Sequence, residues 1–414
     1  MSPSNASTSA PKTKYLVLGG LAAAHLFNDT FQSLIPAVLP LLKGELLLSY
    51  IQVGLIMTVF QLSSSICQPI VGWITDKYPF PYALPCGMTS TLLGILLLSS
   101  AMSFPAVLCA VAFIGFGSAV FHPEGARLTF MAAGKRRGFA QSLFQTGGNT
   151  GTSIGPLLAA LLITPYGRSN IVWFAILVFC AILWMIPLSR WYGRRLNERK
   201  LSEKADKKKT VADSSSGTLP KHTVYAALAV LLILVFSKNL YTVSFSSFFT
   251  FYLIEKYQLT VRESQLFLFA FLFATAAGTM IGGPIGDKIG RKLVIWFSIL
   301  GAAPFALLLP HIDSLWGTCL LSMFIGATMA SSFPAIVIFA QELLPGKIGT
   351  VGGLFFGFSF GAAAIASVLL GGLADLWGIT FVYGCCAFMP LIGLMTWFLP
   401  NLPRSTQHLP NREN

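Results

Sequence analysis

The chain contains about twelve long apolar runs, separated by short breaks that are polar or marked by glycine and proline. A helix that crosses the hydrocarbon core of a bilayer needs roughly 20 mostly apolar residues, which is the length of these runs. Because 54% of the 414 residues are hydrophobic and only 10% are charged, the surface must face lipid. The sequence therefore predicts an all-α membrane protein with twelve transmembrane helices. The expected spans are 15–42, 50–75, 82–102, 105–131, 138–164, 170–192, 223–254, 262–286, 291–310, 314–341, 349–374 and 379–400.

The formal net charge of +13 is concentrated in alternate breaks between the apolar runs. The intervening breaks hold only Lys43, Arg168, Lys256 and Arg262. Lys and Arg accumulate in short loops on the cytoplasmic side of a membrane. We therefore expect both termini and the central loop in the cytoplasm, with the chain in a bacterial inner membrane. Topology accounts for the basic excess, and no nucleic-acid partner is expected.

A hydrophilic segment rich in Lys, Arg, Glu, Asp and Ser lies between the sixth and seventh expected spans. Its composition is that of a solvated linker. The expected organisation is a cytoplasmic N-terminal tail at 1–14, a six-helix bundle at 15–193, a cytoplasmic linker at 194–222, a second six-helix bundle at 223–400 and a cytoplasmic tail at 401–414.

The two halves of the chain are related by one constant offset of 211 residues. Because each half has an even number of spans, both enter the membrane from the same side, which defines a parallel repeat. We expect two pseudo-symmetric six-helix bundles with a substrate site between them near the bilayer midplane. The pairs are Asn28 with Asn239, Leu48 with Leu259, Gly72 with Gly283, Asp76 with Asp287, Lys77 with Lys288, Ile114 with Ile325, Gly115 with Gly326, Pro123 with Pro334, Gly138 with Gly349 and Gly167 with Gly378.

The segment Gly283-Pro-Ile-Gly-Asp287-Lys288-Ile-Gly290-Arg291-Lys292 resembles the loop signature G-x-x-x-D-[RK]-x-G-[RK]-[RK] of the major facilitator superfamily. The resemblance implies the fold of that superfamily and a transporter rather than an enzyme. A glycine lets two helices approach closely, and an aspartate at a helix end can cap a neighbouring helix or pair with an arginine. We expect this segment to help hold the cytoplasmic face closed.

The repeat-related segment Gly72-Trp-Ile-Thr-Asp76-Lys77 keeps the glycine, the aspartate and one cation. Tyr78-Pro-Phe-Pro-Tyr82 replaces the trailing glycine and basic residues, so we expect a less secure latch in this half. The alternative for Asp287 and its neighbouring cations is an ordinary cytosolic turn with the basic residues usual there.

The fifth expected span contains Gly147-Gly-Asn-Thr-Gly151-Thr-Ser-Ile-Gly155-Pro156, which resembles the antiporter motif G-x-x-x-G-P-x-x-G-G. Ala159 and Ala160 stand where that motif has its last two glycines. The resemblance implies an exporter that exchanges its substrate against protons. Small residues four apart also serve plain helix packing in membranes, which is the alternative.

Within the superfamily, two segments resemble the fosmidomycin resistance group: Ala24-His25-Leu-Phe-Asn28-Asp29-Thr-Phe-Gln32-Ser33-Leu-Ile-Pro36 and Phe121-His122-Pro123-Glu124. Further agreement covers almost the whole chain outside the tails and the central loop. The resemblance implies drug export, with an anionic phosphonate antibiotic such as fosmidomycin as the substrate.

Ionisable residues inside the expected spans cost at least about 2.5 kcal/mol each on insertion scales, so they are candidates for function. His25, Asn28, Asp29 and Gln32 fall at i, i+3, i+4 and i+7 and share one helix face. We predict proton coupling by Asp29, Glu124, His122 and His25, and substrate binding by Lys238, Arg127, Asn28, Gln32 and Asn239.

The hypothesis for the mechanism is competition for cations. An anionic substrate would engage Lys238 and Arg127 and weaken their hold on Asp29 and Glu124, which would then bind protons more readily. Imidazole titrates near neutrality, so His122 and His25 could relay protons. The alternative is that Asp29 with Lys238, and Glu124 with Arg127, are structural ion pairs, and that each histidine is a hydrogen-bonded helix contact.

Two other functions remain open. An importer or exchanger of an organic anion or sugar phosphate on the same fold would also need cations in its cavity. A membrane-embedded enzyme or sensor is disfavoured, because the seven cysteines lack zinc-site spacing and neither a nucleophile elbow nor a phosphate-binding loop is found. We expect no cofactor, no metal ion and a protein that acts as a monomer.

Overall fold

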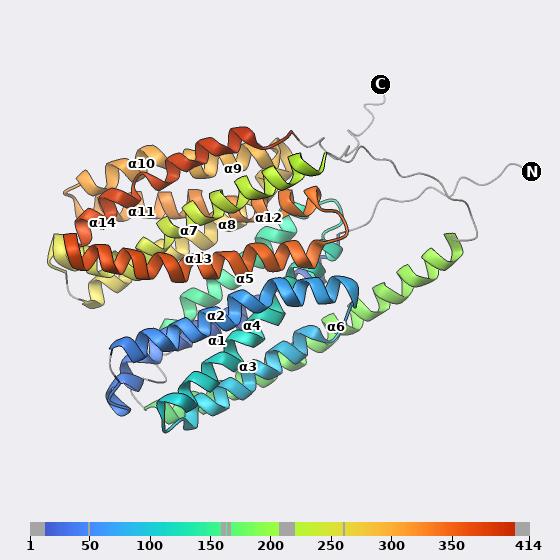
Figure 1. Cartoon of the computed structure of the whole chain (residues 1–414), viewed down its shortest axis with the longest axis horizontal. Coiled ribbons are helices and arrows are strands. Elements are labelled where there is room, and N and C mark those ends of the chain that lie inside the picture. Colours follow the sequence, from blue (N-terminus) through green and yellow to red (C-terminus); the bar gives the residue numbers. More distant parts are fainter. Residues whose placement is uncertain are drawn as a thin grey trace, which may run out of the picture.

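The computed structural model describes residues 13–48, 50–158, 163, 167–206, 220–259 and 261–401, which form helices and short connections (Figure 1). The first half comprises α1 (Tyr15–Glu45), α2 (Tyr50–Lys77), α3 (Ala83–Ser100), α4 (Phe104–Ala132), α5 (Arg137–Leu158), η2 (Arg168–Ile171) and α6 (Val172–Asp206). The second half comprises α7 (Lys221–Tyr257), α8 (Val261–Ile289), α9 (Arg291–Leu300), α10 (Ala303–Leu308), η3 (Leu309–His311), α11 (Leu315–Ala330), α12 (Ser332–Leu343), α13 (Ile348–Trp377), α14 (Ile379–Cys386) and η4 (Met389–Phe398).

Ten helical stretches of the described residues are long and apolar enough to cross a membrane. α1 and α5 are not among them, because α1 carries the polar residues of 25–32 and α5 is rich in glycine, threonine and asparagine. These two helices pack against each other. The polarity of α1 and α5 therefore indicates helices that face protein rather than lipid. The ten apolar stretches confirm the predicted all-helical membrane fold.

The ninth, tenth and twelfth expected spans are each interrupted, which the apolar pattern did not predict. The tenth span is divided into α11 and α12 at Ser331, three residues before Pro334. The twelfth continues after α14 as η4, where Pro390 lies in the first turn. Proline lacks the N–H that a helix interior needs. Pro123, in contrast, lies within a continuous α4.

The backbone repeats with the same offset of 211 residues as the sequence. In the described chain two residues other than glycine have positive φ, Leu47 at 50° and Gln258 at 54°, and they are equivalent under this offset. Gly167 and Gly378 are also equivalent and have φ of 84° and 82°. A left-handed residue ends a helix and turns the chain. The two bundles therefore share their turns as well as their helices.

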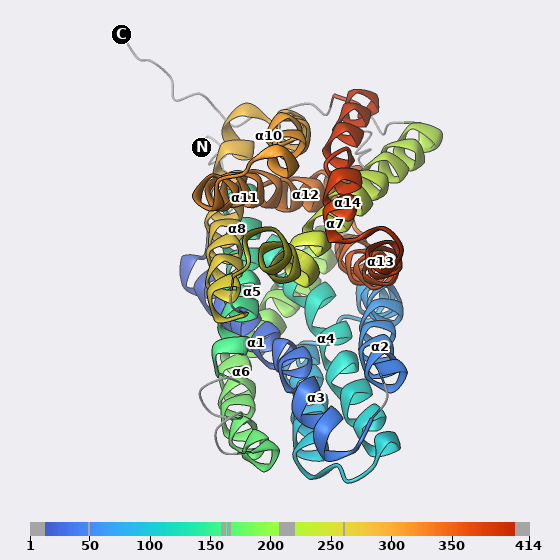
Figure 2. The same ribbon diagram turned by 90° about the vertical axis from the view of Figure 1, so that its left-hand side faces the viewer.

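The two bundles lie side by side in Figures 1 and 2, with the first half coloured blue to green and the second half yellow to red. Across their boundary α2 packs against α13, and α5 packs against α8. The offset relates α2 to α8 and α5 to α13, so the two contacts are equivalent. α6 runs on to Asp206 and projects from its bundle (Figure 1), so the segment expected as a linker begins as a helix.

Candidate functional site

Asp29 on α1 lies between two histidines. His25 Nε2 is 3.3 Å from Asp29 Oδ2, and His122 Nε2 on α4 is 3.6 Å from Asp29 Oδ1. His25 and Asp29 share a helix face because they are four residues apart. Both imidazoles are buried, whereas the Asp29 side chain is 16% exposed. Two bases and one acid therefore form a cluster that is accessible along one edge.

The second nitrogen of each histidine faces a backbone carbonyl. His25 Nδ1 is 2.8 Å from the Phe144 oxygen, and His122 Nδ1 is 2.9 Å from the Ser118 oxygen. A carbonyl can only accept, so each Nδ1 carries a hydrogen. Each Nε2 then faces the Asp29 carboxylate, and this contact is attractive when Nε2 is also protonated. The geometry therefore suits a proton-binding group.

Two amides complete the environment of Asp29. Asn28 Nδ2 and Gln32 Nε2 donate hydrogen bonds to Asp29 Oδ1 at 2.9 and 3.1 Å. Both bonds use lone pairs of this oxygen. The four residues expected on one face of α1 thus converge on a single carboxylate, and the amides of Asn28 and Gln32 are engaged by it.

Histidine and aspartate also bind metal ions in other proteins. Within the described residues, the donor atoms of His25, Asp29 and His122 lie within 4.8 Å of one another, so this is where a small cation could be held. The sequence predicts no metal, and we interpret the cluster in terms of protons.

Lys238 on α7 is a partly buried cation in the second bundle. Its Nζ lies 4.9 Å from the centre of the Phe333 ring on α12. No carboxylate of the described residues lies within 4.0 Å of this nitrogen. The alternative that pairs Asp29 with Lys238 is therefore wrong, because Asp29 is paired with the two histidines of its own bundle. Asn239, the repeat equivalent of Asn28, donates to the Ser359 oxygen at 3.4 Å.

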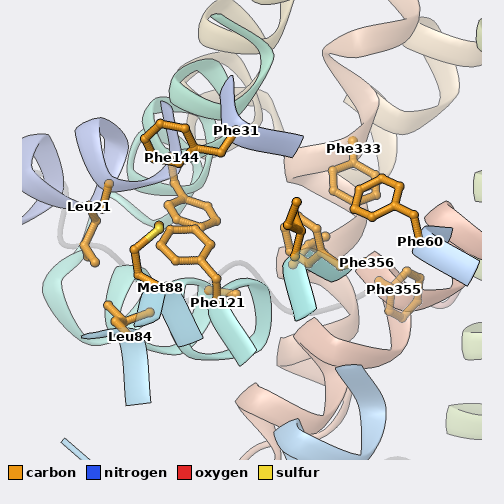
Figure 3. Close-up of a cluster of buried hydrophobic side chains, with 14 of the residues drawn as sticks. Leu21, Phe31, Phe60, Leu84, Met88, Phe121, Phe144, Phe333, Phe355 and Phe356 are labelled. Carbon is orange, nitrogen blue, oxygen red and sulfur yellow. The ribbon is translucent and has the colours of Figure 1, made fainter. Parts of the chain in front are cut away.

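Aromatic rings separate the histidines from Lys238. Phe356 on α13 lies 5.1 Å from the His122 ring and 5.3 Å from the Phe333 ring, measured between ring centres. Figure 3 shows Phe356 and Phe333 of the second bundle opposite Phe144 of the first. The rings of Phe356 and Phe333 therefore link the His122 ring to the Lys238 ammonium through successive contacts.

Asp76 at the end of α2 closes the boundary with α13. Its Oδ1 accepts the Gly349 N–H at 3.0 Å, and its Oδ2 accepts the Thr350 N–H at 2.7 Å. The first turn of a helix has free N–H groups and a partial positive charge, so it favours an anion. The changed residues at 78–82 do not remove this contact, because Asp76 bonds to the backbone of α13.

Arg127 on α4 joins the same boundary. Its guanidinium donates to Asp76 at 2.5 Å, to Glu124 at 2.7 Å and to the Thr75 oxygen at 2.6 Å. The expected Glu124–Arg127 pair is therefore present, while Arg127 is 5% exposed and held by groups of its own bundle. Glu124 Oε2 is buried and has no hydrogen-bond partner. The structure thus places Arg127 beside the boundary of α2 with α13.

Asp287 makes the equivalent contact at the end of α8. It accepts the Gly138 N–H at 2.9 Å and the Phe139 N–H at 3.1 Å, both in the first turn of α5. Arg291 lies 3.4 Å from the same carboxylate. We call the Asp76 contact with α13 and the Asp287 contact with α5 the two latches. They obey the offset of 211 residues seen in the sequence.

Glu342 on α12 lies beside the Asp287 latch and was not among the predicted site residues. It lies 3.4 Å from Arg291 and 3.4 Å from Arg137, and so joins the two bundles. The sequence signal that could have indicated this role is an acidic residue near the basic segments expected on the cytoplasmic side.

The other motif positions lie at helix ends. Gly290 has a φ of 102° before α9 begins, and Lys292 donates to the Leu399 oxygen at 2.5 Å. Lys77 lies 5.8 Å from an aromatic ring of its own helix, and Lys288 is exposed.

The glycine-rich face of α5 brings its backbone against the Asp29 cluster. A Cβ on Gly151 would meet the Leu26 oxygen, and a Cβ on Gly148 would lie 2.5 Å from His25 Nε2. Helix packing is therefore one role of this motif. Gly155 and Pro156 also belong to α5, whereas Ala159 and Ala160 lie outside the described residues.

Comparison with known proteins identifies the family. The sequence profile of the Major Facilitator Superfamily matches residues 21–260 and 230–414. Over 396 residues the chain is 52% identical to the fosmidomycin resistance protein of Escherichia coli (strain K12), which covers 96% of this chain and 95% of that protein. Over 389 residues it is 41% identical to an uncharacterized MFS-type transporter of Bacillus subtilis (strain 168), with 94% of each chain covered.

Solved structures of the same superfamily share the fold. The transporter FucP in the outward conformation superposes with a TM-score of 0.72 at 14% identity, covering 94% of this chain and 100% of that one. The proton:xylose symporter XylE gives a TM-score of 0.72 at 12% identity, covering 93% and 96%. These structural matches confirm the expected fold. The family profile and the relative in Escherichia coli confirm a multi-pass membrane transporter rather than an enzyme. The chain belongs to the Major Facilitator Superfamily.

Proposed function

We propose that the protein is a proton-coupled antiporter that exports a small anionic drug-like molecule, such as the phosphonate fosmidomycin, from a bacterial cytoplasm. The observation that supports this proposal is that Lys238, a partly buried cation without an acidic partner among the described residues, is linked to the cluster of Asp29, His25 and His122 by the rings of Phe333 and Phe356. The 52% identity to the fosmidomycin resistance protein of Escherichia coli supports the substrate class.

Lys238 is proposed to bind the anionic group of the substrate. A charge inside a membrane protein is costly unless it has a partner or faces water. The described residues offer Lys238 an aromatic ring but no carboxylate within 4.0 Å. An anionic substrate supplies the missing partner. Arg127 already has two carboxylates and backbone oxygens as partners, so we assign it, with Glu124, to the latch.

Asp29 with His25 and His122 is proposed to carry the coupled proton. A proton bound at the cluster would attract an anionic substrate, so charge alone would favour binding of both at once. Antiport requires that the proton and the substrate bind in turn, and this needs a steric cause. Phe356 supplies one, because its ring contacts both the His122 ring and the Phe333 ring beside Lys238. A substrate that displaces Phe356 changes the packing around His122, and the two ligands then alternate.

The latches are proposed to close the cytoplasmic face. They lie at the ends of α2 and α8, next to the basic segments that the positive-inside rule places in the cytoplasm. One similar structure is described as outward-facing. In the same proposal, both tails and the linker between the bundles 15–193 and 223–400 lie in the cytoplasm, and the protein works as a monomer.

Closing the latches requires glycine where the helices cross. A Cβ on Gly283 would meet the Gly138 oxygen, and a clash costing about 1–3 kcal/mol would disfavour the closed state. We expect Gly283→Ala to reduce the initial rate of fosmidomycin uptake into everted membrane vesicles about tenfold, since about 1.4 kcal/mol corresponds to that factor. Gly372→Ala is the matched control, because a Cβ there meets nothing within 4 Å. Equal rates in the two variants would contradict the role of the crossing.

The direct test of the function compares drug susceptibility in cells with and without the protein, together with uptake into everted vesicles under a proton gradient. Antiport predicts resistance to fosmidomycin and uptake driven by an acidic vesicle interior. The second candidate, an importer or exchanger of an organic anion or sugar phosphate, is also compatible with Lys238 as a cation without an acidic partner among the described residues. It predicts unchanged susceptibility and accumulation with the opposite direction of proton coupling.

A further inference from the structure

A row of buried side chains runs from Asp29 across α4 to α2. Gln32 Oε1 accepts a hydrogen bond from Ser118 Oγ at 3.0 Å, and Ser118 Oγ is 3.1 Å from Ser64 Oγ. Ser64 Oγ accepts from Gln68 Nε2 at 3.2 Å. Ser118, Ser64 and Gln68 are fully buried, and Gln32 is 7% exposed. Four polar side chains therefore form one continuous file inside the first bundle.

The hydrogens of this file have a single direction. An amide oxygen only accepts, so the Ser118 hydroxyl donates to Gln32. Ser118 must then accept from Ser64, and Ser64 accepts from the amide of Gln68. Gln32 in turn donates to Asp29 Oδ1 at 3.1 Å. Every donor thus points toward the Asp29 carboxylate, and hydrogen bonds aligned in this way strengthen one another.

The far end of the file lies at the boundary between the bundles. A Cβ on Gly353 of α13 would meet the backbone oxygen of Gln68. Gln68 Oε1 is also buried and has no hydrogen-bond partner. An unpartnered buried acceptor is costly, so this end has a reason to rearrange.

We propose that Ser118, Ser64 and Gln68 are positioning residues that link the protonation of Asp29 to the boundary of α2 with α13; this rests on the function proposed above. When Asp29 gains a proton, its hydroxyl donates to the oxygen of a rotated Gln32 amide. Gln32 then donates to Ser118, Ser118 to Ser64, and Ser64 to Gln68 Oε1. The reversed file satisfies the unpartnered oxygen and reorients the side-chain amide of Gln68, whose backbone packs against α13. Each protonation state of Asp29 therefore has its own direction of hydrogen bonding along the file, in which every bond has one donor and one acceptor.

Replacing one hydroxyl separates this role from a purely structural one. Ser118→Ala interrupts the file and keeps Asp29, His122 and Lys238, but it also removes the contact of Ser118 Oγ with His122 Nδ1 at 3.2 Å, which Ser64→Ala leaves in place. In proteoliposomes with radiolabelled fosmidomycin, we expect uptake driven by a pH gradient to fall about tenfold, and fosmidomycin self-exchange at equal pH to stay within about twofold. Ser64→Ala should show the same split. Ser90→Ala is the control, because its hydroxyl also bonds to α4, at the Phe113 oxygen, outside the file.

The possible results separate the relay from the function on which it rests. Loss of driven uptake with retained exchange in Ser118→Ala and Ser64→Ala supports the relay. Equal loss of both activities would mean a structural role and would overturn it, as would wild-type values for both. If the wild-type protein shows self-exchange but no uptake driven by a pH gradient, the proposed proton coupling fails first and the relay fails with it.

Discussion

Lys238→Met should reduce the uptake of fosmidomycin into everted vesicles about 10- to 100-fold at low substrate concentration. Methionine keeps much of the length of lysine but removes the charge. A charge-assisted hydrogen bond contributes about 1.5–3 kcal/mol, and about 1.4 kcal/mol is a factor of ten. Because the lost contact is with the substrate, we expect the lower uptake to result mainly from a higher KM.

Two further variants make this result specific. Lys238→Arg keeps the charge and should retain more transport than Lys238→Met. Lys221→Met changes an exposed lysine at the start of the same helix and should have no effect. If Lys238→Met transports fosmidomycin with the wild-type KM, the anion site does not include Lys238.

Asp29→Asn is expected to lower uptake driven by a pH gradient by about 100-fold, a loss of transition-state stabilisation of about 2.7 kcal/mol. Asparagine has nearly the same shape but does not titrate, and its amide cannot pair with charged imidazoles as a carboxylate does. Self-exchange of fosmidomycin at equal pH should persist, since it needs no net proton movement. The two rates are measured in the same proteoliposomes.

Asp313→Asn is the matched control for this experiment. It makes the same chemical change at a carboxylate whose side chain is 99% exposed, and it should leave both rates unchanged. Driven uptake at the wild-type rate in Asp29→Asn would exclude Asp29 as the proton carrier.

The latches could be predicted from sequence because they depend on residues that recur at one offset. Asp76 with Gly349 and Asp287 with Gly138 are equivalent pairs, and an aspartate beside the first turn of a helix has a physical reason to cap it. A less secure latch was expected at Asp76 because residues 78–82 lack the glycine and basic residues of the second half. The structure shows that its partners are backbone amides and Arg127, so that loss is of little consequence.

The site itself could be predicted only in part. Helical spacing placed His25, Asn28, Asp29 and Gln32 on one face, and the structure brings all four together. Which carboxylate each cation meets could not be read from sequence, because spacing along one helix does not specify the contacts between helices. Arg127 is taken by Asp76 and Glu124, which leaves Lys238 without an acidic partner among the described residues.

Ser118, Ser64 and Gln68 were not predicted at all. A serine or glutamine in an apolar run costs little and carries no pattern of its own, so only the packing of α2 on α4 shows that they form a file. The breaks at α11–α12 and α14–η4 were missed because hydropathy measures polarity and not the continuity of helical hydrogen bonds.

In the proposed function, the Asp29 cluster of one bundle and Lys238 of the other work together in one transport cycle. The most direct measurement follows the pH inside proteoliposomes while fosmidomycin is added outside. The account predicts that fosmidomycin entry drives protons outward in the wild-type protein, and that this movement is lost in Asp29→Asn and in Lys238→Met. Fosmidomycin accumulation without proton movement, or wild-type proton movement in either variant, would contradict it.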